Sequence, residues 1–505
     1  MTGAGPPPGT DTGAAPASAG SATGSVTDVA ATAGSVTLRR ALGLRTVVST
    51  STGLAFAAVE YLAAAGLVVY VAGDSAWIAV MTAGLLALVA WGCFSELNGM
   101  FPTAAAIRLY MRRAMDDRVA LIITFSYLTT IVLVVAADAF IVGAAIAHVL
   151  NQSRWVAAVV IAALLATAVT ANLRGVTVAG GVQDVATYSV LLATAVVAVS
   201  ALMRSHGALR FPFSPLHGHH PGDFVEAVAL GVFLFSAFEW VTTSAEEVRH
   251  PPDIHRGMLI ALAALVTVCS LITVAMSHVL DHRQLVSSYP QLFLGRAAFG
   301  QAGLWLMAAV TAATAVNTFN GGFITASRFI YATAREGTLP PLLARLNDRA
   351  VPWVPVVALG VSSLVVSLVV AATGCWAVLV AVGAALEALI YAVAAFCVLR
   401  LMARLPAHHR PFRLRARRVL GVLGVGVFGL LAVVASVSVS NHFDLVPVVV
   451  LAVCASLSAT YVLVVLPRVR AAEEARRAAR GRRRPPRRPA DASASPPGEA
   501  PAGAS

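Results

Sequence analysis

Apolar runs of about 20 residues recur along almost the whole chain, and they constrain its fold more than any other feature. A helix of this length spans the hydrocarbon core of a bilayer. Because backbone N–H and C=O groups cannot stay unpaired in lipid, the runs are expected to be helices. Roughly twelve candidate spans follow, near residues 47–70, 76–95, 119–147, 155–171, 182–203, 224–245, 257–280, 302–327, 353–372, 376–399, 419–438 and 445–466. With 58% hydrophobic and 12% charged residues, the chain is predicted to be an all-α polytopic membrane protein.

The basic residues, all 36 of them Arg, fix the expected orientation. If the N-terminus is cytoplasmic, the inner loops hold Arg108, Arg112, Arg113, Arg118, Arg174, Arg249, Arg256, Arg335, Arg345, Arg349 and the group from Arg400 to Arg418. The outer loops hold only Arg154, Arg204, Arg210, Arg283 and Arg296. This asymmetry follows the positive-inside rule and predicts a plasma-membrane protein with both termini in the cytoplasm. It also accounts for the net charge of +12 without nucleic acid as a partner. The Arg-rich and Ala-rich composition favours a bacterial source.

Both ends of the chain differ in composition from the transmembrane domain, which is predicted over 39–466. Residues 1–38 are rich in Ala, Gly, Ser, Thr and Pro and are predicted to be a disordered cytoplasmic tail. Residues 467–505 are basic and then rich in Pro, Ala and Ser, and are predicted to be a second one. The basic part has two readings: it binds anionic membrane lipid, at about 1 kcal/mol per residue, or it only sets the topology.

Acidic residues inside the predicted spans are the main functional signal. Glu239 lies within an apolar run, and a charge at membrane depth costs roughly 2.5 to 3.5 kcal/mol, so such residues usually face a substrate or ion path. Asp138 and Glu387 also lie inside predicted spans, and Glu60 and Asp184 are weaker cases. Hydrogen bonding to a neighbouring helix is the alternative for each.

The motif search argues against an enzyme. The sequence has no nucleophile elbow, phosphate loop or metalloprotease motif. Its five Cys have no paired spacing, so neither a metal site nor a disulfide framework is expected, and no cofactor is predicted.

Four segments in the same order resemble the amino acid–polyamine–organocation transporter superfamily. They are SELNGMFPTAAAIRLY (95–110), NLRGVTVAGGVQDVAT (172–187), FSAFE with AEEVRHPPDIHRG (235–257) and SRFIYATAREGTLPPLLARLN (327–347). The resemblance implies a LeuT-like core of two inverted five-helix repeats, followed by two extra helices. The first repeat is expected over about 47–203, the second over about 224–399 and the extra helices over about 419–466. An odd number of spans per repeat inverts the second repeat, in agreement with the predicted topology.

The resemblance also implies that the first helix of each repeat is broken near the midplane, where free backbone groups bind substrate. In span one the candidate break is the run from Ser49 to Gly53, and the amides of Thr52, Gly53 and Leu54 are assigned to a substrate carboxylate. Ser51 stands where the family usually has a glycine. The alternative is that these Ser and Thr side chains only bond back to their own helix and bend it.

In span six the corresponding candidates are Phe235, Ser236 and Ala237, whose carbonyls would meet the substrate amine, with Phe235 or Phe238 as a hydrophobic gate. Glu239 has three open roles: to pair with a second amine, to accept backbone hydrogens in the unwound segment, or to exchange a proton.

Coupling would involve a proton or sodium. The proton candidates are Asp138, Glu239 and Glu387, and if Asp138 carries the proton, Asp138→Asn should abolish pH-dependent uptake in a folded protein. Sodium would need paired hydroxyls on span eight beside carbonyls of span one, and span eight offers Thr314, Asn317, Thr318 and Thr325.

Charges at the cytoplasmic end of span six suggest an inner gate. Glu246 and Glu247, with Glu96 and Arg335, can form ion pairs that break when the protein opens inward; solvated charges with no gating role are the alternative.

Together these features predict a secondary transporter, or permease, that moves amino acids across the plasma membrane by alternating access, either proton-coupled or exchanging. The alternatives are a polyamine or organic amine transporter and a non-transporting amino-acid sensor.

Overall fold

The computed structural model describes residues 42–103, 106–175, 180–205, 221–439, 442–443 and 445–471. All of the predicted N-terminal tail and most of the predicted C-terminal tail lie outside this range. The helices of the first half are α1 (Leu44–Ala55), the π-helix η2 (Val59–Ala64), α2 (Ala65–Ala72), the short 3-10 helix η3 (Gly73–Ser75), α3 (Ala76–Met100), α4 (Ala106–Ala114), α5 (Asp117–Val149), α6 (Arg154–Leu173) and α7 (Gly180–Arg204). The second half has α8 (Pro221–Phe233), the 3-10 helix η4 (Phe238–Ser244), α9 (Pro252–Val279), α10 (His282–Leu285), α11 (Pro290–Arg335), η5 (Pro341–Ala344), α12 (Trp353–Thr373) and α13 (Trp376–Arg404). After these come α14 (Arg417–Val437), the two-residue strands β1 (Ser438–Val439) and β2 (His442–Phe443), α15 (Val446–Thr460) and η6 (Tyr461–Val465).

The spans predicted from hydropathy all fall on helices. In the described part of the chain, 11 helical stretches are long and apolar enough to cross a membrane. One of them, Val59–Met100, contains the end of the first predicted span and all of the second, divided at Gly73, whose φ of +55° ends α2. The rest of the first predicted span is α1, which at 12 residues is too short to be counted as a membrane-spanning stretch by itself. The predicted all-α polytopic fold is confirmed.

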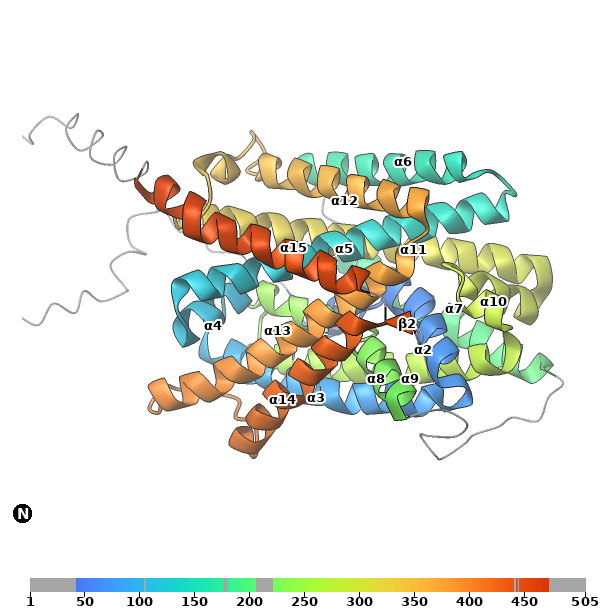
Figure 1. Ribbon diagram of the computed structural model, residues 1–505, viewed down its shortest axis with the longest axis horizontal. Coiled ribbons are helices and arrows are strands. Elements are labelled where there is room, and N and C mark those ends of the chain that lie inside the picture. Colours follow the sequence, from blue (N-terminus) through green and yellow to red (C-terminus); the bar gives the residue numbers. More distant parts are fainter. Residues whose placement is uncertain are drawn as a thin grey trace, which may run out of the picture. The chain divides into compact units, whose positions relative to one another are not determined.

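Matching contacts relate the two halves of the bundle. α1 packs on α9 just as α8, the equivalent first helix of the second half, packs on α3. The fifth helix of the first half, α7, lies against α11, and its counterpart α13 lies against α5. In Figure 1, α6 and α12, the fourth helices of the two halves, run side by side. This exchange of equivalent contacts is what a five-plus-five inverted repeat produces.

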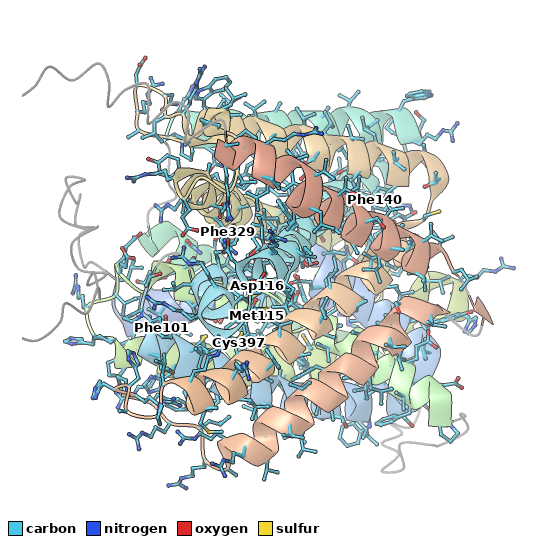
Figure 2. All side chains as sticks on the ribbon, turned by 60° about the vertical axis from the view of Figure 1, so that its left-hand side comes forward. Phe101, Met115, Asp116, Phe140, Phe329 and Cys397 are labelled. Carbon is cyan, nitrogen blue, oxygen red and sulfur yellow. The ribbon has the colours of Figure 1, made fainter. Side chains whose placement is uncertain are left out.

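The outward faces of the helices are apolar, as expected for helices solvated by lipid rather than by water. Trp155 on α6, Leu430 on α14 and Leu457 on α15 are among the many large apolar side chains that are exposed. Figure 2 shows side chains projecting from α14 and α15 away from the bundle. α15 is the least covered of these helices, with Pro447 its only buried residue.

Candidate functional site

The first helix of the first half is interrupted at Phe56–Ala58. α1 ends at Ala55, Phe56 has non-helical angles (φ −101°, ψ 47°), and η2 begins at Val59. The predicted break at Ser49–Gly53 is therefore wrong by several residues, because these residues form regular helix. The Ser49 hydroxyl donates to the Thr46 carbonyl, 3.1 Å away, which is the local back-bonding that the alternative reading described.

This shift changes which backbone groups face the gap. The N–H groups of Thr52, Gly53 and Leu54 lie in the last turn of α1, where they donate to carbonyls of the preceding turn. Their assignment to a substrate carboxylate does not fit this geometry. A helix C-terminus instead leaves its last carbonyls without helical partners, and these carry partial negative charge. The end of α1 is thus suited to a cation.

The second interruption lies at Leu234–Ala237, within the predicted sixth span. α8 ends at Phe233, and Ala237 takes a left-handed conformation (φ +65°) before η4. Phe235, Ser236 and Ala237, the candidates from the sequence, form the interruption itself and are completely or almost completely buried. The Tyr391 hydroxyl on α13 donates to the Phe235 carbonyl at 3.1 Å.

The two interruptions are joined by side-chain hydrogen bonds. The Ser51 hydroxyl on α1 donates to the Phe238 carbonyl at 2.7 Å. The Ser236 hydroxyl donates to the carboxylate of Glu60 on η2. These bonds bring the candidate residues of spans one and six into one site.

Four acidic side chains gather around this site: Glu60, Asp138 on α5, Glu239 on η4 and Glu387 on α13. Each is 0 or 1% exposed. Glu60 lies close enough to the other three to interact with them electrostatically. None of the four is ion-paired to a basic residue in the described part of the chain, although both buried arginines there, Arg108 and Arg410, are paired with other acids.

Among the described residues, several oxygens of this cluster have no hydrogen-bond donor from the protein. They are Glu60 Oε2, Asp138 Oδ2, Glu239 Oε1 and both carboxyl oxygens of Glu387. Buried carboxylate oxygens are almost always satisfied in native proteins, so these oxygens make the cluster a candidate place for water, protons or a cation. The cluster therefore has the properties of a cation site.

Glu239 and Glu387 interact directly with each other. When both are ionised, neither offers a donor to the other, which explains their unpartnered oxygens. Tyr391 lies beside the pair, with its hydroxyl 3.5 Å from Glu239 Oε2. A single proton or ammonium group between the two carboxylates would satisfy both.

Asp138 has a different environment from this pair. Its Oδ1 accepts the backbone N–H of Val59 at 2.8 Å. Val59 is the first residue of η2, so Asp138 caps the start of the second half of the broken helix. A carboxylate at this position is stabilised by the partial positive charge of the helix N-terminus.

The sodium-site candidates on α11 are all buried. The Thr314 and Thr318 hydroxyls donate to carbonyls of their own helix. Asn317 donates instead to Thr187 on α7 at 3.2 Å. Thr325 is 7% exposed. The oxygens of these side chains keep their capacity to accept a cation, and sodium coupling stays a prediction.

The four predicted gate residues separate into different roles. Glu247 pairs with Arg328 of α11 at 3.1 Å, and Glu246 is exposed one residue earlier. The guanidinium group of Arg335 lies over the Tyr331 ring, 5.7 Å from its centre, and forms no ion pair with the described acids. Glu96 is buried and pairs with Arg410 at 2.5 Å rather than with Arg335, so its partner differs from the expected one and a part in an inner gate stays a prediction. This pair fixes the loop before α14 to the end of α3.

Contacts at the same end of the bundle join α1 to its neighbours. Arg45 and Asp184 form an ion pair at 3.3 Å between α1 and α7, and the same carboxylate is an alternative acceptor for the Ser49 hydroxyl. Leu42 forms backbone hydrogen bonds with Glu247 and Arg249, so the chain before α1 is tied to the chain after η4. These contacts hold α1 against α7 and against the chain after η4.

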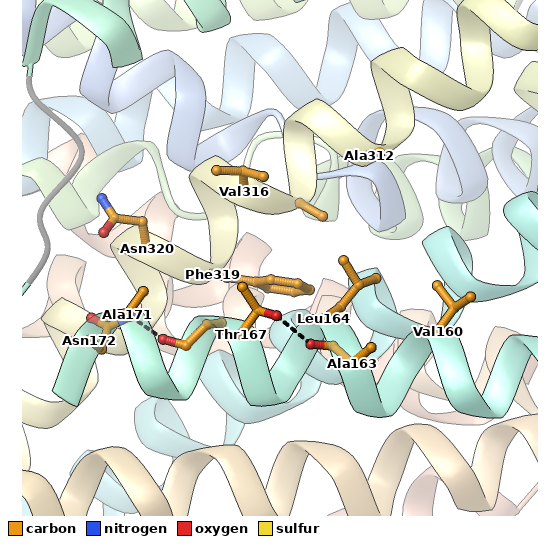
Figure 3. Close-up of a pocket in the computed structure, with 12 residues that line it drawn as sticks. Val160, Ala163, Leu164, Thr167, Ala171, Asn172, Ala312, Val316, Phe319 and Asn320 are labelled. Carbon is orange, nitrogen blue, oxygen red and sulfur yellow. Dashed lines mark hydrogen bonds between the residues drawn. The ribbon is translucent and has the colours of Figure 1, made fainter. Parts of the chain in front are cut away.

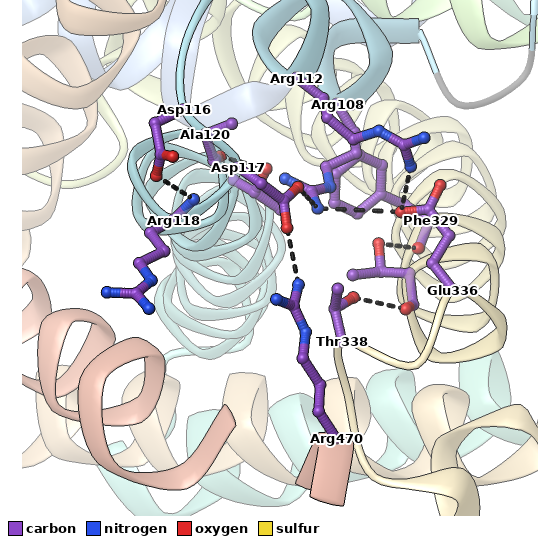
Figure 4. Close-up of polar contacts among 12 residues, drawn as sticks. Arg108, Arg112, Asp116, Asp117, Arg118, Ala120, Phe329, Glu336, Thr338 and Arg470 are labelled. Carbon is purple, nitrogen blue, oxygen red and sulfur yellow. Dashed lines mark hydrogen bonds and ion pairs between the residues drawn. The ribbon is translucent and has the colours of Figure 1, made fainter. Parts of the chain in front are cut away.

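A further ionic network extends across the predicted cytoplasmic end (Figure 4). Asp117 at the start of α5 pairs with Arg108 of α4 and with Arg470, both at 2.7 Å. Glu336, which follows α11, pairs with Arg112 at 3.2 Å and with Arg108 at 3.8 Å. The C-terminal helix is thereby linked to α4, α5 and α11.

A partly open groove between α6 and α11 lies away from these interruptions (Figure 3). Its volume is about 350 Å³, and Leu164, Thr167, Val316 and Phe319 are among its lining residues. None of the predicted substrate residues lines it. The acidic cluster is instead enclosed, because the four acids and the interruption residues Phe235, Ser236 and Ala237 are all buried.

Sequence reasoning did not identify Tyr391 as part of the site and ranked Glu60 too low. Tyr391 follows Glu387 by four residues and so lies on the same face of α13, a spacing visible in the sequence. Glu60 would have followed from a correct position for the break in span one.

Comparison with known proteins gives a consistent result. The sequence profile of the family described as amino acid permease matches residues 42–474. An uncharacterized amino acid permease, YecA of Bacillus subtilis, is 24% identical over 309 residues, which cover 58% of this chain and 71% of that protein. The Asc-type amino acid transporter 1 of Homo sapiens is 26% identical, and the match covers 48% of this chain and 47% of that protein. The mouse protein of the same name is 27% identical over 42% of this chain and 39% of its own length. The chain thus spans less than half of these mammalian relatives.

The likeness to solved structures extends over more of the chain. A structure of a manganese transporter from Eremococcus coleocola has a TM-score of 0.56 and 15% identity, and covers 84% of this chain and 94% of that chain. At this identity the likeness concerns the fold alone. In the described residues of the present chain, no group of three or more His, Cys, Asp or Glu side chains is arranged to hold a metal ion.

Proposed function

This chain belongs to the amino acid permease family and is a membrane transporter, and we propose that it carries amino acids or related organic amines across the plasma membrane by alternating access. The substrate ammonium group would bind between the carbonyls at the end of α1 and the facing carboxylates of Glu239 and Glu387. Both termini would lie in the cytoplasm, as the distribution of Arg predicts.

The observation that carries this proposal is the buried acidic cluster without a basic partner. Several unpaired negative charges at membrane depth would be strongly unfavourable. The cluster must therefore take up positive charge, as protons on its carboxyl groups or as a cationic ligand, whenever the bundle is closed as it is here. An ammonium group supplies that charge together with three hydrogen-bond donors.

The same requirement leads to an exchange cycle. Without substrate, the carrier returns only if a proton shared by Glu239 and Glu387 replaces the substrate ammonium, which leaves the pair with the same single negative charge as in the loaded carrier. Substrate binding displaces this proton, and the loaded carrier then reorients. Net uptake of a cation would accordingly be accompanied by proton release, and an outward proton gradient should drive it. Exchange of internal for external substrate needs no gradient.

Opening toward the predicted cytoplasmic side would require α1 and η4 to move away from α7 and α11. The Arg45–Asp184 and Glu247–Arg328 pairs join these two groups of helices. Both pairs include a half-exposed or largely exposed Arg, so each is worth only about 0 to 1 kcal/mol and breaks readily. The backbone bonds of Leu42 would keep α1 and η4 together as they move.

Uptake and counterflow of labelled amines in proteoliposomes test the proposal. The full-length protein should accumulate at least one amino acid or amine, faster when the lumen is acidic. Glu239→Gln should reduce this uptake at least tenfold. Glu247→Gln removes a carboxylate from the same segment, outside the site, and is the matched control that should keep most of the activity. Binding without uptake or counterflow would contradict the proposal and favour a sensor.

A further inference from the structure

We propose that Asp138 occupies the anion position of the site, so that the preferred substrate is an organic amine without a carboxylate, such as an aliphatic diamine. The inference rests on the proposed transport function and names its substrate class. It also assigns Asp138 a role different from that of a proton carrier.

The start of the second half of helix one is the place where a substrate carboxylate would find positive potential. Backbone N–H groups at a helix N-terminus bind anions, and broken helices in membranes use this property. Here η2 continues directly into α2, so the helix from Val59 to Ala72 is long enough to have a substantial dipole. The Val59 N–H is already bound by Asp138 Oδ1 at 2.8 Å.

The other half-helix start in the site is also faced by an acid of the protein. η4 begins at Phe238, just after the left-handed Ala237. Glu387 lies beside the backbone at Ala237 and interacts with Glu239. A substrate carboxylate arriving at this second helix start would meet two carboxyl groups.

No basic side chain in the site can compensate for this acidity. The chain contains no Lys, and the only buried arginines of the described residues are Arg108 and Arg410. Arg108 pairs with Asp117 and Glu336, and Arg410 pairs with Glu96. A carboxylate on the substrate would thus add a negative charge to an acidic cavity without gaining a partner.

The arrangement of the acids suits an extended organic cation rather than a metal ion. No three of the described His, Cys, Asp and Glu side chains converge as metal ligands. The unpartnered oxygens instead occur in two groups: Asp138 and Glu60 near the first interruption, and Glu239 and Glu387 near the second. Two ammonium groups on one aliphatic chain would satisfy both groups.

Amino acids and their decarboxylated products form matched pairs that isolate the effect of the carboxylate. Uptake into proteoliposomes containing the full-length protein is measured for cadaverine against lysine and for putrescine against ornithine. In each pair the diamine should have at least a tenfold higher kcat/KM. Equal or faster transport of the amino acids would overturn the inference and leave the proposed function intact. If neither diamines nor any amino acid are transported or exchanged, both fail.

Two variants test the role of Asp138 itself. Asp138→Ala frees the Val59 N–H for a substrate carboxylate, so the diamine preference should fall at least tenfold. Glu387→Gln removes an acid without freeing that N–H; it should slow both members of a pair and change their ratio much less than Asp138→Ala does. Asp138→Asn retains an oxygen acceptor for Val59 and serves if the alanine variant does not fold, with a smaller fall of the ratio expected. An unchanged ratio in a folded Asp138 variant would contradict the inference.

Discussion

Replacing Glu96 should destabilise the protein without opening a gate. In the structure Glu96 Oε1 lies 2.5 Å from Arg410 Nη1, and Glu96 Oε2 accepts the Leu414 N–H at 3.1 Å. Both charged side chains are 1 or 2% exposed. Glu96→Gln keeps the shape of the side chain but leaves Arg410 as a buried cation. The nearby Arg417, 3.8 Å from Glu96, makes the remaining charge more unfavourable.

The magnitude follows from the burial of this pair. Removing one partner of a buried ion pair costs about 3–5 kcal/mol, because the other charge is left uncompensated. Unfolding entropy of about 2.1 cal/mol/K per residue means that, in a chain of this size, 1 kcal/mol lowers Tm by roughly 1 °C. Glu96→Gln should therefore lower Tm by about 3–5 °C.

Thermal unfolding of the detergent-solubilised protein, followed by tryptophan fluorescence, measures this shift. The exposed Glu247–Arg328 pair provides the comparison, since Glu247→Gln should cost at most about 1 kcal/mol. The double variant Glu96→Gln with Arg410→Gln removes both charges and should recover a large part of the lost stability. Arg410 also donates to the Leu401 and Leu405 carbonyls, so recovery need not be complete.

Two results would refute this reasoning. A Tm unchanged by Glu96→Gln would mean that the pair does not anchor the loop before α14. A normal Tm combined with a several-fold faster opening toward the predicted cytoplasmic side would restore Glu96 to the gate.

Three further substitutions test other parts of the site. Arg45→Gln breaks the exposed pair with Asp184 and should leave Tm within about 1 °C of the wild type. The hydrogen-exchange rate of the α1 amides should rise at least threefold, and an unchanged rate would argue against a gating role for this pair. Gly53→Ala would bring a Cβ within 2.6 Å of Thr187 Oγ1, so transport should fall strongly. Adding Thr187→Ala should restore part of it, and full activity of the single variant would contradict this packing. Tyr391→Phe removes the hydroxyl that donates to the Phe235 carbonyl. The free energy of unfolding should fall by about 1 kcal/mol, and amine uptake should fall several-fold; wild-type uptake would exclude the hydroxyl from the site.

The fold was predictable because membrane helices have a strong local signal. Runs of apolar residues long enough to span a bilayer require helices wherever they occur, whatever their neighbours. Glu239 was identified for the same reason, since an acid inside such a run has few structural explanations.

The break in the first helix was misplaced because its cause is not local. The run from Ser49 to Gly53 suggests an interruption, but its hydroxyls bond within the helix or to other helices. The actual interruption, Phe56–Ala58, consists of apolar residues without a sequence signature. Asp138, 79 residues away from Val59, caps the helix that follows.

The partner of Glu96 was not predicted for a similar reason. Its partner Arg410 is 314 residues away, in a group of arginines that the sequence explains by topology alone. Which of these arginines is buried depends on the packing of the loop before α14. Tyr391 differs from these cases, because its spacing from Glu387 was available in the sequence.

The location of a bound amine tests the central claim most directly. A cryo-EM map of the full-length protein with saturating cadaverine should show density between the two helix interruptions, with one ammonium within hydrogen-bond distance of Glu239 or Glu387. The other end should approach Glu60 and Asp138. Density confined to the groove between α6 and α11, or an empty acidic cluster at saturating ligand, would contradict the account.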